Sequence, residues 1–308
     1  MDSFHKSVLK KEAIEFLNIR SGGVYVDATL GGGGHLAEMF NTVNDIKVIA
    51  FDIDMEAIQH TKQVRQLVDN DKIIFVNKNF SYLSSALALN NIKEIDGILF
   101  DLGISSHQIS KKGRGFSFNQ NERLDMRMNQ NGNISAFEVV NFYPQKELAR
   151  VIHEYCEDRY WKRITKKIVE ERAKKPIETT FQLKKLIEEV IPRNYSIKSF
   201  ARVFQAIRIE VNKELDSLKK ALESVVPVLK KGGRIVVISY HSLEDRIVKN
   251  FFKYENLKCI CPPKFPKCIC SKEKRLEIIT KHPKLPSKEE IERNPQSRSA
   301  KLRVAERC

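Results

Sequence analysis

The stretch VYVDATLGGGGHL, residues 24–36, constrains the fold of this chain more than any other. The β-branched and aromatic residues at its start are typical of a strand. Four consecutive glycines, Gly31 to Gly34, follow the predicted strand, and a helical pattern begins after them. This order is typical of a nucleotide-binding α/β unit, because glycine lets the backbone turn tightly and approach a ligand closely.

A carboxylate at a matching position strengthens this interpretation. Asp52 ends the second predicted strand, KVIAFD. It lies about 20 residues after the glycine loop, the spacing at which an acidic side chain holds ribose hydroxyls. A purely structural glycine turn remains the alternative at this point.

The apolar runs of the first third alternate with helical patterns. Such alternation predicts a parallel sheet with helices on both faces. The predicted strands are residues 24–28, 47–52, 72–76 and 97–101, and the helical stretches are 36–43, 55–68 and 80–90.

The alternation stops for roughly a third of the chain and then resumes. Between 108 and 230 the pattern predicts helices only, including one long helix over 144–174 and another from 200 to 229 that ends at Gly232-Gly233. Further strands are predicted at 234–239, 276–280 and 301–305. We therefore expect an α/β fold with a seven-stranded Rossmann-like methyltransferase sheet. Residues 1–107 and 211–308 would form this sheet domain, and 108–210 an inserted helical domain that binds RNA.

Charge separates the same segments. The chain has 54 Lys+Arg and 39 Asp+Glu, a net charge of +15. Residues 108–210 contain 21 basic and 13 acidic side chains, a net charge of +8, whereas the sheet-forming part before residue 253 is close to neutral. A segregated positive charge favours a polyanion such as nucleic acid as partner, and a solvated surface is the alternative. The first residues contain no signal-peptide core, and no apolar run is long enough for a membrane span, so we expect a cytoplasmic protein without membrane contact.

Several motifs in order resemble one family. They are HKSVL, YVDATLGGGGH, FDIDMEAI, DGILFDLGISS, RGFSF, RLDMRM, FQAIRIEVNKEL, GGRIVVISYHSLEDRIVK and NPQSRSAKLRVAE. Together they resemble the bacterial small-subunit (16S) ribosomal RNA cytosine-N4 methyltransferases that use S-adenosylmethionine. The resemblance implies methylation of the exocyclic amine of a cytosine in the decoding region of 16S rRNA, with the small ribosomal subunit as partner.

The resemblance also implies a cofactor site. The glycine loop would lie against the methionine part of S-adenosyl-L-methionine, Asp52 would hold the ribose, and Phe80 would lie beside the adenine. The implied cofactor-binding residues are Gly33, Gly34, His35, Asp52, Phe80, Asp101 and Gln108. Each has a simpler alternative: His35 at a helix start, Phe80 in the core, Gln108 as a surface side chain.

Two residues are candidates for the chemistry. Asp101 ends the fourth predicted strand and can accept a hydrogen bond from a cytosine amine, with Ser105 as possible help. Many amino-methyltransferases carry Pro-Pro after this acid, and this chain has Leu102-Gly103 instead, so a role for Asp101 in cofactor binding alone stays open. His241, just after the fifth predicted strand, is the second candidate, and a structural helix cap is its alternative. A DNA amino-methyltransferase and a non-catalytic RNA-binding assembly factor are the competing functions.

Two further segments are open to more than one interpretation. The segment 111–129 mixes arginines, among them Arg114 and Arg127, with Phe116 and Phe118. That mixture suits a single-stranded RNA base and its phosphates, and the alternative is a loop that tethers the insertion with its phenylalanines buried. We favour a lid that does both. Four cysteines at 259, 261, 268 and 270 form C-x-C-x6-C-x-C, which is either a zinc site or a set of incidental thiols, and we assign no metal ligand from sequence. No protein partner is evident, although a homodimer is compatible with the sequence.

Overall fold

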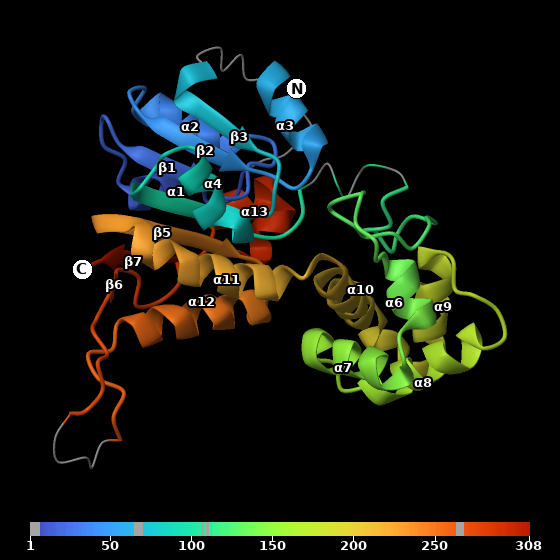
Figure 1. The fold of residues 1–308 in the computed structure, drawn as a ribbon. Coiled ribbons are helices and arrows are strands. Elements are labelled where there is room, and N and C mark those ends of the chain that lie inside the picture. Colours follow the sequence, from blue (N-terminus) through green and yellow to red (C-terminus); the bar gives the residue numbers. More distant parts are fainter. Residues whose placement is uncertain (1–6, 65–69, 106–107, 109–110, 112, 263–267) are drawn as a thin grey trace. The chain divides into compact units, whose positions relative to one another are not determined.

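The computed structural model divides into two compact units. It describes residues 7–64, 70–105, 108, 111, 113–262 and 268–308. Residues 1–103 and 215–308 form the sheet unit, and residues 104–214 form the inserted unit (Figure 1). The sequence boundaries expected for these domains were 107/108 and 210/211.

The sheet unit is built on one seven-stranded sheet with the order β3-β2-β1-β4-β5-β7-β6. The strands are β1 (Val24–Asp27), β2 (Lys47–Phe51), β3 (Ile73–Val76), β4 (Ile95–Asp101), β5 (Leu229–Ser239), β6 (Leu276–Ile278) and β7 (Lys301–Arg307). β1 to β5 pair in parallel, whereas β7 pairs antiparallel with β5 and β6. The predicted fold class and the final strand pair are confirmed.

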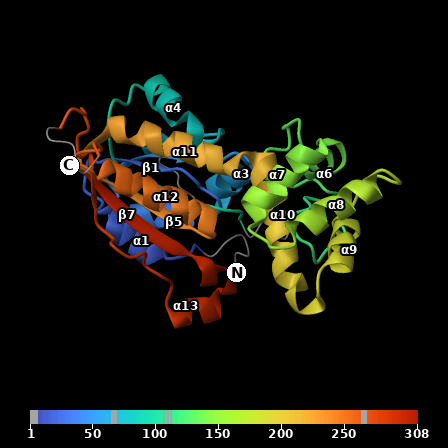
Figure 2. The same cartoon turned by 90° about the horizontal axis from the view of Figure 1, so that it is seen from below.

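Successive side chains of a strand point to opposite sides of the sheet, so both faces carry apolar side chains. Helices cover both faces and bury these side chains. The helices of this unit are α1 (Lys10–Leu17), α2 (Gly34–Thr42), α3 (Met55–Val64), α4 (Leu83–Leu89), α11 (Glu214–Val225), α12 (Ser242–Glu255) and α13 (Lys288–Arg293). In β1, Val26 packs in one core with side chains of α4, α11 and α12, and its neighbour Tyr25 packs in the other core with side chains of α1 and α2. Figure 2 shows α1, α4, α11 and α12 around the sheet. The end of the predicted helix 55–68 lies outside the described residues.

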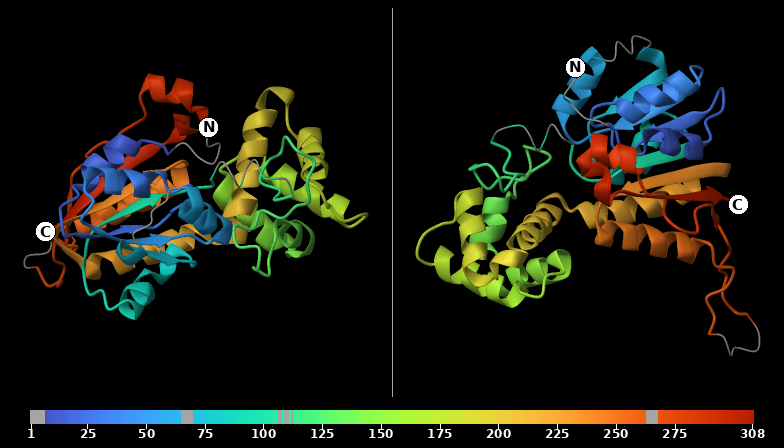
Figure 3. Two further views of the ribbon diagram at one scale, coloured as in Figure 1. Left: turned by 90° about the horizontal axis from the view of Figure 1, so that it is seen from above. Right: turned by 180° about the vertical axis from the view of Figure 1, so that it is seen from behind.

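The inserted unit is helical and has its own core. Its helices are α6 (Ala136–Phe142), α7 (Gln145–Cys156), α8 (Trp161–Arg172), α9 (Thr180–Val190) and α10 (Ser196–Asn212), shown in green to yellow in Figure 3. The core draws apolar side chains from all five helices and from the loop before them. Among the described residues 113–228 there is no strand, only an isolated bridge between Arg123 and Thr179.

The long helix expected over 144–174 is wrong. Glu157 adopts a left-handed conformation with φ 49°, which ends α7. The Asp158 side chain then accepts the N–H of Tyr160 at 2.8 Å, and α8 begins at Trp161. The apolar stripe that suggested one helix is shared by two, since both bury their stripes in the same core.

The helix expected from 200 to 229 is also divided. Lys213, with φ 51°, separates α10 from α11, and a 3-10 turn at Val226–Val228 leads directly into β5. Gly232 therefore lies inside β5, where the pairing register with β4 shifts, and does not end a helix. Within the described ranges, no helix has the length and apolar character needed to cross a bilayer.

Candidate active site at the carboxyl edge of the sheet

The glycine loop connects β1 to α2 and leaves the start of that helix open. Gly33 precedes the helix with φ 68°, and no described side chain caps its N-terminus. The first N–H groups of α2 are therefore suited to an anionic group. A Cβ at Gly33 would lie 2.6 Å from Thr61 Cγ2 on α3, so glycine is required there by helix packing. Gly34 is the first residue of α2.

Asp52 follows β2 and is held in place by backbone donors. Its Oδ2 accepts the N–H of Gly31 at 2.8 Å, and its Oδ1 accepts the N–H of Asp54 at 2.8 Å. Burial raises the pKa of Asp52 to about 6, and the two N–H groups oppose this rise. Each carboxylate oxygen can still accept one more hydrogen bond, as a ribose diol requires.

Phe80 lies just after β3. It begins a 3-10 turn, Phe80–Tyr82, which Asn79 caps by accepting the N–H of Ser81 at 2.8 Å. The ring is half-buried and meets Phe100 edge to face at a centroid distance of 5.5 Å. Phe80 thus packs against the core, as the structural alternative expected, and part of its surface stays accessible.

Asp101 ends β4 and is surrounded by polar side chains. Its Oδ1 accepts the hydroxyl of Tyr240 at 2.7 Å, and its backbone N–H donates to Thr29 Oγ1 at 2.7 Å. His35 Nδ1 lies 3.6 Å from Asp101 Oδ2, while Nε2 of the same ring donates to the Val8 carbonyl at 3.2 Å. Burial, and next the charge of Asp101, raise the pKa of Tyr240 well above its usual value, so the hydroxyl keeps its proton and remains a donor.

Asp27, at the end of β1, is a further member of this edge that sequence reasoning missed. It is 1% exposed, and its Oδ1 accepts the Thr29 N–H at 3.1 Å. Its Oδ2 is buried and has no hydrogen-bond partner among the described residues. Burial raises the pKa of Asp27 to about 7, and the charges of Asp101 and Asp52 add to the rise. Its position at a strand end just before the glycines was the signal that could have identified it.

Comparison with known protein families gives a match over nearly the whole chain. Residues 2–308 match the model of the MraW methylase family. The chain belongs to the MraW methylase family. The methyltransferase activity and the family resemblance that the motifs predicted are therefore confirmed.

Relatives of the methylase are similar over nearly their whole length. "Ribosomal RNA small subunit methyltransferase H" of Caldicellulosiruptor saccharolyticus is 52% identical over 305 residues, covering 98% of this chain and 99% of that protein. The protein of the same name from Clostridioides difficile is 49% identical over 311 residues and covers both chains completely. A putative methyltransferase from Streptococcus mutans in complex with SAH is 11% identical with a TM-score of 0.45, covering 98% and 99% of the two chains. At that TM-score the structural likeness adds nothing to the assignment.

Two predicted site residues of the methylase have local structural roles. Gln108 belongs to the inserted unit, where its Oε1 accepts the Ser105 N–H at 3.1 Å and its own N–H donates to Ser105 Oγ at 3.2 Å. His241 precedes α12 and caps it: its Nδ1 accepts the Glu244 N–H at 3.4 Å, and Glu244 Oε2 accepts the His241 N–H at 3.3 Å. The described contacts of His241 are thus those of a helix cap, which was the structural alternative for this residue. The cofactor role of Gln108 and the catalytic role of His241 stay predictions.

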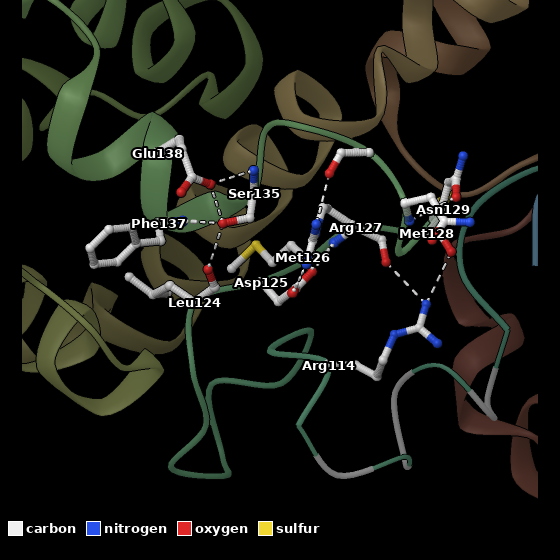
Figure 4. Close-up of polar contacts among 12 residues, drawn as sticks. Arg114, Leu124, Asp125, Met126, Arg127, Met128, Asn129, Ser135, Phe137 and Glu138 are labelled. Carbon is white, nitrogen blue, oxygen red and sulfur yellow. Dashed lines mark hydrogen bonds and ion pairs between the residues drawn. The ribbon is translucent and has the colours of Figure 1, made fainter.

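Two of the arginines expected to contact RNA in segment 111–129, Arg114 and Arg127, form hydrogen bonds within the loop (Figure 4). Arg114 is 4% exposed, and its Nη2 donates to the carbonyls of Arg127 and Met128 at 3.0 and 3.1 Å. Arg127 forms a two-bond pair with Asp125 at 2.9 and 2.7 Å. The RNA interpretation is wrong for Arg114, because its guanidinium is desolvated and donates to carbonyls within its own loop. Phe116 and Phe118 pack in the core of the inserted unit, as the alternative expected.

An exposed group elsewhere in the inserted unit has the features expected of an RNA contact. The Arg159 guanidinium lies 4.7 Å from the ring centre of Tyr160 and 4.3 Å from that of Tyr195. The two tyrosine rings are 6.2 Å apart, and Tyr195 is 41% exposed. Tyr195 is distant in sequence from Arg159 and Tyr160, so local sequence patterns do not group the three residues.

Proposed function

We propose that this methylase transfers a methyl group from S-adenosyl-L-methionine to the exocyclic N4 amine of a cytosine in the decoding region of 16S rRNA. The observation that carries the proposal is the set of relatives, 46–52% identical over nearly full length, that are named as ribosomal RNA small subunit methyltransferases. The family motifs add the N4 position. The protein acts in the cytoplasm on RNA of the small subunit.

The carboxyl edge of the sheet fits the cofactor. S-adenosylmethionine supplies an electrophilic methyl group on a sulfonium when it is bound. The open start of α2 suits the carboxylate of its methionine part, and Asp52 suits both ribose hydroxyls. The orphan Oδ2 of Asp27 is a buried acceptor that suits an ammonium donor. Phe80 offers the accessible part of its ring to an adenine.

Asp101 is the residue that prepares the amine. A cytosine amine is a poor nucleophile because its lone pair is delocalised into the ring. Asp101 accepts an N–H hydrogen bond from the amine, which restores lone-pair character, and it can receive the proton that the amine loses. Tyr240 holds the carboxylate in position through its 2.7 Å hydrogen bond. The remaining task is to place the base and exclude water.

The inserted unit binds the RNA in this proposal. Its net charge of +8 over residues 108–210 gives phosphate attraction, 21 basic against 13 acidic side chains. Arg159, Tyr160 and Tyr195 give a platform on which an unpaired base stacks. A paired base must first leave its helix, at a cost of a few kcal/mol.

The test is to incubate the purified chain with labelled cofactor and, separately, 16S rRNA, small subunits and DNA of the same sequence. Nucleoside mass spectrometry then identifies the product. We expect N4-methylcytidine from the ribosomal substrates alone. A methyl group on carbon 5, or equal transfer to DNA, would contradict the proposal.

A further inference from the structure

Between α12 and β6, the described residues 256–262 and 268–275 of the sheet unit form a segment that extends away from the sheet (Figures 1 and 3). Its described residues form neither helix nor strand. It exposes Leu257, Ile260 and Ile269, the last at 75%. A segment this exposed has no apolar core to order it and requires another source of stability.

The base of the segment is tied to the sheet unit by Glu255, which pairs with Arg275 and with Lys272. Arg275 donates to both carboxylate oxygens of Glu255 at 2.6 Å, and the Arg275 N–H donates to the Glu255 carbonyl at 2.9 Å. Glu255 is buried at the end of α12. These contacts fix both ends of the segment but not its middle.

The middle of the segment gathers four sulfur atoms. All four Sγ atoms lie within 4.8 Å of one another. The distances from Cys268 Sγ are 3.4 Å to Cys259, 3.9 Å to Cys261 and 3.6 Å to Cys270, and Cys259 lies 3.6 Å from Cys270. A tetrahedral zinc site with Zn–S bonds of about 2.3 Å has S···S edges of about 3.8 Å. The observed spacing suits a single ion at the centre of the group.

Backbone groups of the segment already favour thiolate. The N–H of Ile260 donates to Cys270 Sγ at 3.4 Å and the N–H of Cys261 donates to Cys259 Sγ at 3.3 Å. A bound cation would offset the repulsion between four adjacent thiolates.

We propose that Cys259, Cys261, Cys268 and Cys270 bind one zinc ion that holds the described stretches 256–262 and 268–275 together. Four protein sulfurs complete the tetrahedron and leave no position for water or substrate, so the site is structural. The one-residue spacing within each pair differs from the usual two to four. The pair Cys259 and Cys261 and the pair Cys268 and Cys270 still supply four ligands to one ion.

The experiment uses the full chain, purified with reductant and stripped by a chelator. Zinc is added back, unbound metal is removed, and bound zinc is measured by inductively coupled plasma mass spectrometry. We expect about one zinc per chain. Cys259→Ser and Cys270→Ser should each lose this equivalent, whereas Cys308→Ser, which changes an exposed cysteine outside the group, should keep it. Cobalt added in place of zinc should give the absorption of a tetrahedral thiolate complex.

Two outcomes overturn the proposal. One is a reduced, folded chain that takes up neither zinc nor cobalt. The other is a chain isolated without reductant whose mass is lower by four hydrogens, because these cysteines would then form two disulfides. Circular dichroism of every variant confirms that the sheet unit is folded, so loss of metal cannot be attributed to unfolding.

Discussion

The carboxyl edge of the sheet and the surface of the inserted unit use charge in opposite ways. At the sheet edge, Asp27 is 1% exposed and the Asp101 side chain is 8% exposed. In the inserted unit, Arg159 is exposed and stacks on tyrosine rings. Interactions at the first region are barely screened, whereas those at the second weaken with salt. Burial therefore determines the protonation of the carboxylates at the sheet edge, whereas the exposed arginine contributes to an RNA affinity that depends on salt.

Two arginines of the inserted unit show the same contrast over a short range. Arg114 is desolvated and donates to two carbonyls of its own loop, so it is part of the loop structure. Arg159 keeps its charge accessible to a partner. Residue type alone does not distinguish these roles, because burial determines which group the guanidinium meets.

The largest expected effect is on turnover at the sheet edge. Asp101→Ala should lower single-turnover methylation by about 10²–10⁴-fold, because the amine loses its acceptor. RNA binding should change little. Tyr240→Phe is the matched variant: it keeps the carboxylate and removes only the hydroxyl that positions it, so its loss should be smaller. Turnover is measured at saturating cofactor and RNA. Near-normal turnover of Asp101→Ala would remove Asp101 from the chemistry.

A second effect is on stability against pH. The folded pKa of Asp27, about 7, lies above its ordinary value of 3.8, so its stabilising contribution is complete below pH 3.8 and is lost as pH rises through about 7. Asp27→Asn should therefore gain about 2–4 kcal/mol of unfolding free energy over the wild type above pH 7, and little at pH 4. Urea unfolding at a series of pH values measures this. Asp71→Asn, at an exposed site, is the control, and an unchanged pH profile for Asp27→Asn would show that Asp27 is not desolvated.

The third effect is on cofactor affinity. Asp52→Ala should weaken S-adenosylmethionine binding by about 1.5–3 kcal/mol through the loss of two charge-assisted hydrogen bonds. Since the pKa of Asp52 is raised to about 6, wild-type affinity should also fall as pH drops through that value. Calorimetry tests both statements. Unchanged affinity of the variant would contradict the ribose assignment.

The smallest expected effect lies in the inserted unit. Arg159→Ala should weaken RNA binding about fivefold and reduce the salt slope by about one. Lys219→Ala removes the same charge from the sheet unit and should leave the slope nearly unchanged. Fluorescence anisotropy at several salt concentrations compares the two. Equal losses for both variants would mean that overall charge, and not the arginine-tyrosine group, attracts the RNA.

The local pattern of the sequence was enough to predict the strands of the sheet and some of the residues at its carboxyl edge. Strand, turn and helix patterns are local, and they placed Asp52 and Asp101 at strand ends. Parallel strands bring their carboxyl ends to one edge, so these two residues could be grouped without a structure. The family motifs then gave the chemistry to be expected there.

The tertiary structure decided whatever depends on side chains that are distant in sequence. Tyr240 meets Asp101 across 139 positions, and Tyr195 meets Arg159 across two helices. The left-handed residues that divide the expected long helices have no strong sequence signal, because Glu157 and Lys213 are ordinary helix formers. Burial likewise separated Arg114 from Arg159, since desolvation depends on what surrounds a side chain and not on its own residue type.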